Sequence, residues 1–72
     1  MPGELQAAGA IAELLSKVFG FVVDPDGLAQ LSRANLLKYL MRGINEGIAC
    51  ADWASVDALF FHYRELRQPT GP

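Results

Sequence analysis

The sequence predicts an all-α fold, a small bundle of three main helices with one short helical turn. Apolar residues recur three and four positions apart through three long segments, which is the spacing of one helix face. Capping residues precede the later segments. Strand-forming residues gather only at Phe21, Val22 and Val23, a stretch too short to build a sheet. We therefore expect residues 1–72 to form a single helical domain.

The first helix is expected over residues 4–19 and is unusually apolar. Its polar residues fall within an arc of about a quarter-turn, and Gly20 is suited to end it. The apolar residues cover more of the circumference than one core contact needs, so this helix should contact two surfaces. They are Leu5, Ala7, Ala8, Ile11, Leu14, Leu15, Val18 and Phe19.

A connector and a short second helix should follow. In the connector, Phe21 and Val23 are expected to fill the core rather than to form a strand. Asp24 is suited to cap a helix that starts at Pro25, because proline fits the first helical position. The second helix is therefore expected over residues 25–31.

The third helix is expected over residues 33–49, after a break at Ser32. One unbroken helix would place Leu28 and Leu31 opposite the later apolar stripe, whereas Ser32 is a competent N-cap. The stripe consists of Leu36, Leu37, Leu40, Met41, Ile44 and Ile48.

Two glycines lie inside this third helix. Gly43 and Gly47 each lower the stability of a helix by roughly 1 kcal/mol relative to alanine. Their spacing of four places them on one flank of the helix. We therefore expect another helix to approach closely there. That helix could belong to the same chain or to a second copy across a dimer interface, so both glycines are candidate protein-binding residues.

The last helix is expected over residues 52–67, with Asp52 as its N-cap. Phe61 points away from the inner face on the same side as Ala54 and Ala58, and these three residues form a candidate protein-binding surface. The inner face is expected to hold Trp53, Val56, Leu59, Phe60, Tyr63 and Leu66.

Composition argues against several classes of protein. At 51% hydrophobic and 19% charged, the chain should fold, although the proline-containing tail, residues 68–72, should be flexible. A net charge of −2 gives no electrostatic footprint for nucleic acid or anionic lipid. No apolar run is long enough to span a membrane, and the first fifteen residues lack the basic start of a signal peptide. The expected location is the cytoplasm.

The sequence offers no constellation for catalysis, for a metal ion or for a cofactor. His62 is the only histidine and Cys50 the only cysteine, and neither has a matching second group nearby. We expect His62 on the polar side of the last helix and Cys50 as a buried, inert thiol, with a reactive or dimer-linking thiol as the alternative. The two helical glycines lack the lysine of a phosphate-binding loop.

DNA binding is a weaker alternative. The expected helices 25–31 and 33–49 are joined by a tight turn, as in a helix-turn-helix. Lys38 and Arg42 share the outer face of the second of them, but Glu46 lies near that face and the chain is acidic. A solvated helix face explains these residues better than a DNA contact.

The function we expect is a non-enzymatic protein–protein interaction module, a regulator, adaptor or inhibitor that binds another protein. A chain this short buries only about 60% of its unfolded surface, and one cysteine precludes an internal disulfide, so a partner or a homodimer would add stability. Small chains of this kind are often phage or mobile-element accessory factors, which is a general expectation and not one drawn from particular residues. A structural assembly subunit is a further alternative.

Overall fold

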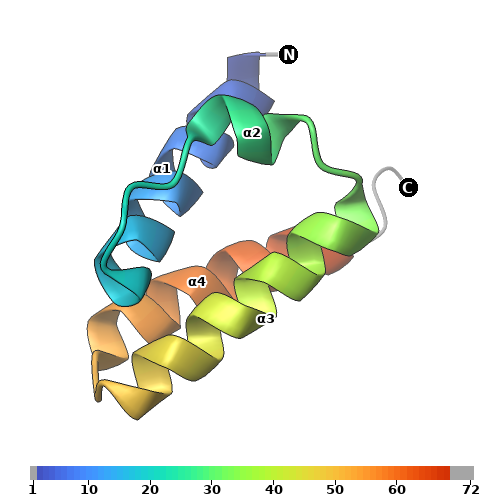
Figure 1. Cartoon of the computed structure of the whole chain (residues 1–72). Helices are drawn as coiled ribbons and strands as arrows, with labels where there is room; N and C mark the ends of the chain where they lie inside the picture. The colour runs from blue at the N-terminus through green and yellow to red at the C-terminus, as the bar shows by residue number, and fades with distance from the viewer. Residues whose placement is uncertain (1, 69–72) are drawn as a thin grey trace.

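Four α-helices and their connections make up residues 2–68, which the computed structural model describes, with side chains described from Ala7 onward. Residues 69–72 of the expected flexible tail and the side chain of Leu5 lie outside this part. The all-α bundle of three main helices is confirmed (Figure 1). The helices are α1 (Pro2–Phe19), α2 (Pro25–Ala29), α3 (Arg33–Ala49) and α4 (Trp53–Arg67).

Side-chain caps determine where α2 and α3 begin. The carboxylate of Asp24 accepts a hydrogen bond from the N–H of Asp26, and the hydroxyl of Ser32 accepts one from the N–H of Asn35. The predicted break at Ser32 is thereby confirmed. The second helix is shorter than expected and ends at Ala29, because the next two N–H groups donate to carbonyls three residues back, the tight turn of a helix end.

A stronger cap begins α4. The carboxylate of Asp52 accepts hydrogen bonds from both the hydroxyl (2.7 Å) and the N–H (3.3 Å) of Ser55, which is buried. These hydrogen bonds, the hydroxyl's first, hold the pKa of Asp52 below its ordinary value of 3.8, and the positive charge of Lys17 adds a smaller effect. Helix α4 therefore starts at Trp53, one residue later than expected, with Asp52 as its cap.

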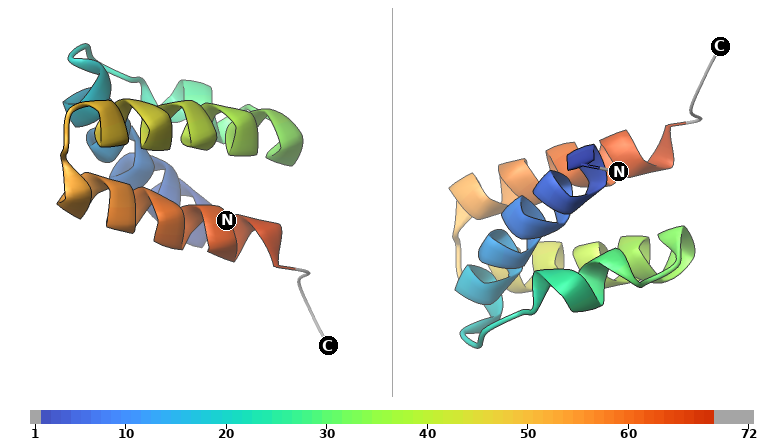
Figure 2. Two further views of the ribbon diagram at one scale, coloured as in Figure 1. Left: turned by 90° about the horizontal axis from the view of Figure 1, so that it is seen from below. Right: turned by 90° about the horizontal axis from the view of Figure 1, so that it is seen from above.

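The helices form two layers. An antiparallel hairpin of α3 and α4 makes one layer, and α1 and α2 lie on one of its faces (Figures 1 and 2). Helix α1 contacts α2 as well as both helices of the hairpin, which confirms that it packs against two surfaces. The apolar surplus of α1 is therefore used within the chain. The most enclosed apolar residues are Ile11, Leu15, Leu40, Ile44 and Leu59.

The glycines of α3 allow close contacts both with α1 in the other layer and with α4 within the hairpin. A Cβ atom added to Gly43 would overlap a terminal methyl group of Leu15 in α1 and would lie 3.5 Å from Cδ1 of Leu59 in α4. One added to Gly47 would lie 2.7 Å from Cγ2 of Val56 in α4. Both glycines are buried, so the close approach is the same-chain contact and not one across a dimer.

The connector after α1 fills the core with Val23 but not with Phe21. The N–H of Val23 donates to the hydroxyl of Ser16 at 2.8 Å, which holds Val23 against α1. Phe21 is 57% exposed, and its expected burial is wrong. Its ring instead stacks on Phe19 at 5.3 Å, and Phe19 in turn stacks on Tyr39 of α3 at 5.5 Å. Phe19 is half-buried and packs against the core, and Phe21 lies over the outer side of its ring.

The different surroundings of Gly47 and Gly9 predict opposite effects on stability when each is replaced by alanine. Gly47→Ala should lower the free energy of unfolding by about 1–2 kcal/mol, because Val56 is β-branched and cannot rotate away. Gly9→Ala in α1 should raise it by up to about 1 kcal/mol, since nothing lies within 4 Å of the added Cβ. Urea unfolding followed by circular dichroism measures both. Equal or greater stability for Gly47→Ala would contradict the close approach.

The cap at Asp52 predicts a pH dependence. Because the folded pKa lies below the unfolded value of 3.8, the stabilisation by Asp52 should be full above that value and lost as the pH falls through the folded pKa. An NMR titration of the Asp52 carboxyl should show the lowered pKa. Ser55→Ala should raise that pKa toward 3.8, whereas Ser16→Ala, a hydroxyl on α1, should leave it unchanged. A wild-type Asp52 that titrates at or above 3.8 would refute the cap.

Candidate functional site

One face of the α3–α4 hairpin carries no described helix. In the left panel of Figure 2 the two helices of the hairpin lie in front of α1, and in the right panel α1 and α2 lie in front of the hairpin. On α3, Tyr39 and Gly43 contact α1 through Phe19 and Leu15. The flank of α3 opposite these two residues therefore belongs to the uncovered face.

Large apolar side chains occupy this uncovered face. Trp53 is 59% exposed, Ile48 47% and Phe60 43%. At about 100° per residue, Met41 and Ile48 fall on the flank of α3 away from Tyr39 and Gly43. We refer to Met41, Ile48, Trp53, Phe60 and Tyr63 together as the hairpin face; Met41 and Tyr63 are half-buried.

The position of Trp53 and Phe60 follows from the packing of α4. Val56 contacts Gly47 of α3. Ser55 is buried and Ala58 half-buried, and at about 100° per residue both fall on the flank turned away from Trp53 and Phe60. Trp53 and Phe60 are three residues before and four residues after Val56, so they fall beyond it on the other side. They therefore lie at the solvent edge of the α3–α4 contact.

The expectation that Trp53 and Phe60 lie inside is wrong, and the reason is physical. In the part of the chain that the structure describes, α4 is covered mainly by α1 and α3, so its buried arc is narrow and is centred on Leu59. The inward flank carries small side chains, Ser55 and Ala58, and the larger aromatic residues remain outside. Small residues flanking Leu59 were the signal in the sequence that could have revealed this.

The aromatic rings of the hairpin face are ordered by contacts with one another. Phe60 meets the ring of Tyr63 edge-on at 6.2 Å, and the guanidinium of Arg67 lies 5.8 Å from the centre of the Tyr63 ring. Both geometries are favourable aromatic contacts. The face therefore presents a partly ordered aromatic surface with a positive charge at one end.

The predicted protein-binding residues fall into an exposed group and a buried group. Phe61 and Ala54 are exposed, Ala58 is half-buried, and the ring of Phe61 meets His62 edge-on at 5.7 Å. The two glycines of α3, in contrast, are enclosed by side chains of α1 and α4. The glycines shape the bundle, and only the group on α4 is accessible to a partner.

Cys50 lies at the end of α3 and is exposed, so its expected burial is wrong. Its N–H donates to the carbonyl of Glu46, and the following residue, Ala51, adopts a left-handed conformation (φ 57°) that turns the chain into α4. The thiol thus belongs to a tight turn at the tip of the hairpin, where no layer covers it. The alternative of a reactive or dimer-linking thiol stays a prediction.

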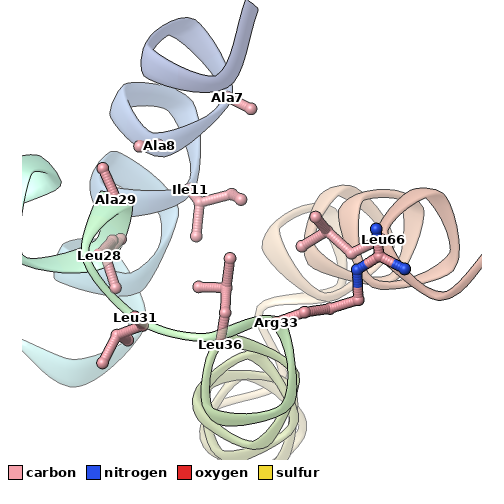
Figure 3. A pocket seen from close by; sticks show the side chains of 9 residues that line it. All are labelled: Ala7, Ala8, Ile11, Leu28, Ala29, Leu31, Arg33, Leu36 and Leu66. Carbon is pink, nitrogen blue, oxygen red and sulfur yellow. The ribbon is translucent and has the colours of Figure 1, made fainter. Parts of the chain in front are cut away.

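A pocket of about 290 Å³ lies between the two layers, at the end of the bundle away from the hairpin turn (Figure 3). Every helix contributes to it, with Ile11 from α1, Leu28 from α2, Leu36 from α3 and Leu66 from α4. Among the described residues that line it, Arg33 at the margin is the one with a charge. The pocket could hold a small apolar group, and its described lining offers no pair of polar side chains for acid–base chemistry. Sequence reasoning missed it because its walls come from four separate elements.

Among the side chains described, those of residues 7–68, no three His, Cys, Asp or Glu groups gather where they could hold a metal ion. The helices of residues 2–68 lack the combined length and apolarity needed to cross a bilayer. Comparisons of the chain with protein-family models, with curated proteins and with solved structures gave no match.

The hairpin face predicts different costs for truncating two adjacent residues. Leu59→Ala should lower the free energy of unfolding by about 2–5 kcal/mol, because Leu59 is fully buried. Phe60→Ala should lower it by no more than about 1.5 kcal/mol, mainly through the lost contact with Tyr63. Urea unfolding at low protein concentration measures both variants. If Phe60→Ala were as costly as Leu59→Ala, the hairpin face would be part of the core.

Proposed function

We propose that this protein is a non-enzymatic protein–protein interaction module that binds its partner through the hairpin face. The observation that carries the proposal is the exposure of Trp53, Phe60 and Ile48 on one uncovered side of the hairpin. Aromatic anchors surrounded by polar residues are typical of binding hot spots. A regulator, adaptor or inhibitor of this size acts by covering a surface of another protein.

The first helix does not add support to this proposal. From Ala7 onward, its apolar side chains lie against α2 and the hairpin, so this part of α1 does not call for a partner. The support comes from α4 instead, where Phe61 on the outer side extends the apolar surface next to Phe60. The proposed binding region is therefore centred on α4.

Location and chemistry are part of the same proposal. An exposed, unpaired thiol at Cys50 suits a reducing compartment, which supports the cytoplasm. His62 contacts the ring of Phe61, a setting that supports a packing contribution and not acid–base catalysis. We propose no enzymatic activity.

Weak DNA binding has less support than protein binding. Lys38 and Arg42 are exposed and four residues apart on α3, but the helix before them, α2, has only five residues. Specific binding of DNA usually rests on several phosphate contacts by Lys and Arg, and this face also carries Glu46. A structural assembly subunit would use the same hairpin face and differs only in what it binds.

Site-specific photo-crosslinking in cells tests the proposal. A photoreactive phenylalanine analogue at Trp53 or at Phe60 should give a discrete adduct with a protein, because these side chains lie in the proposed interface. The same analogue at Gln30, exposed at the end of α2 on the other layer, is the matched control and should give none. Absence of an adduct from both hairpin positions, or the same adduct from all three, would refute the proposal.

A further inference from the structure

We propose that the partner of the hairpin face is a second copy of this chain, with the two α4 helices paired antiparallel about a two-fold axis at Phe60. This inference rests on the proposed function, because it needs the hairpin face to be an interface. It goes further by naming the occupant and the register. Two observations support the inference: the pattern of charges along α4, and the residues of α3 that lie alongside Phe60.

A single stripe on α4 has the spacing of a coiled-coil seam. Its residues alternate at steps of four and three, the repeat that lets two helices pack along their length. All of them are exposed, and they lie on the flank beyond Val56 that α1 does not cover. The members of this stripe are Trp53, Asp57, Phe60, Arg64 and Arg67.

The two opposite charges of the stripe are too far apart to form an ion pair with each other within one chain. Asp57 and Arg64 are seven residues apart, a rise of about 10.5 Å along the helix. Neither has an opposite charge three or four residues away on α4, where helical ion pairs form. The exposed Phe60 thus lies between a negative charge, Asp57, and a positive charge, Arg64, along the stripe.

An antiparallel two-fold pairing satisfies both charges at once. Asp57 lies three residues before Phe60 and Arg64 four after it, so an axis at Phe60 brings each within one residue, about 1.5 Å along the helix, of the level of its opposite on the second copy. Trp53, seven residues before Phe60, faces Arg67, seven after it, whose guanidinium already lies over the ring of Tyr63. A parallel pairing would set like charges opposite each other, so the charge pattern selects the antiparallel one.

The same two-fold axis also passes close to the exposed flank of α3. Gly43 lies beside Leu59 and Gly47 beside Val56, which places Met41 within about two residues of the level of Phe60, or roughly 3 Å along the helix. The axis that relates the two α4 helices therefore also brings the two α3 helices together near Met41.

The α3 pairing is sterically favourable. Ile48, seven residues after Met41, would face the small exposed side chain of Ala34, seven residues before it. One axis serving both helices gives a closed, isologous dimer with hairpin packed on hairpin. The same surface patch is used by both copies, so no open end is left for further growth.

Sedimentation equilibrium of the purified full chain, from about 5 to about 200 μM, tests whether the second copy binds. Cys50→Ser removes disulfide-linked dimers and should leave the result unchanged. We expect a reversible monomer–dimer equilibrium, with a blue shift of the emission of Trp53, the single tryptophan, as the dimer forms. A monomer throughout the range would overturn the inference, whereas photo-crosslinks to a different protein would still support the proposed function.

Charge reversal tests the register. Asp57→Arg and Arg64→Asp should each weaken self-association at least about tenfold, because each sets like charges opposite each other twice. An equimolar mixture of the two variants should restore dimerisation as a heterodimer, and the double reversal in one chain should restore the homodimer. Asp26→Arg, exposed on α2, is the control and should not weaken association. Unchanged association of the single reversals, or a mixture that stays monomeric, would overturn the antiparallel pairing.

Discussion

The packing of the whole bundle follows from the absence of side chains at Gly43 and Gly47. This absence lets Leu15 of α1 and Val56 of α4 approach the backbone of α3, and so sets how α1 packs on the hairpin and how α3 packs on α4. The small side chains of Ser55 and Ala58, buried and half-buried, occupy the flank of α4 opposite Trp53 and Phe60. The large aromatic residues Trp53 and Phe60 remain on the exposed flank. The exposed aromatic surface is thus a consequence of how tightly the opposite side is packed.

The parts of the fold that depend on neighbours in sequence could be predicted. Cap bonds at Asp24, Ser32 and Asp52 join residues two or three positions apart, so the capping residue itself marks where a helix begins. The need for a close helix contact at the two glycines could be predicted in the same way, because glycine inside a helix is costly without a packing reason.

Burial at helix edges could not be predicted, because it depends on which flank another helix covers. Phe60 and Leu59 are adjacent and both apolar, yet only Leu59 is enclosed. The helical repeat gives the direction in which each side chain points from the helix axis. Whether that direction is buried depends on which other helices pack there, and these contacts are non-local in sequence. The same limit applies to Phe21, which lies over the outer side of the Phe19 ring, and to Cys50, which lies at a turn that no layer covers. The pocket beside Leu66 is lined by residues of all four helices, so no single segment of the sequence predicts it.

In the free chain, α1 covers one face of the hairpin and leaves the other to solvent. Side-chain NMR of a dilute sample with a soluble paramagnetic agent measures this directly, residue by residue. We expect strong relaxation enhancement for the rings of Trp53 and Phe60, and protection of the methyl groups of Leu15 and Leu59. Equal protection of Phe60 and Leu59 in the dilute monomer would contradict it.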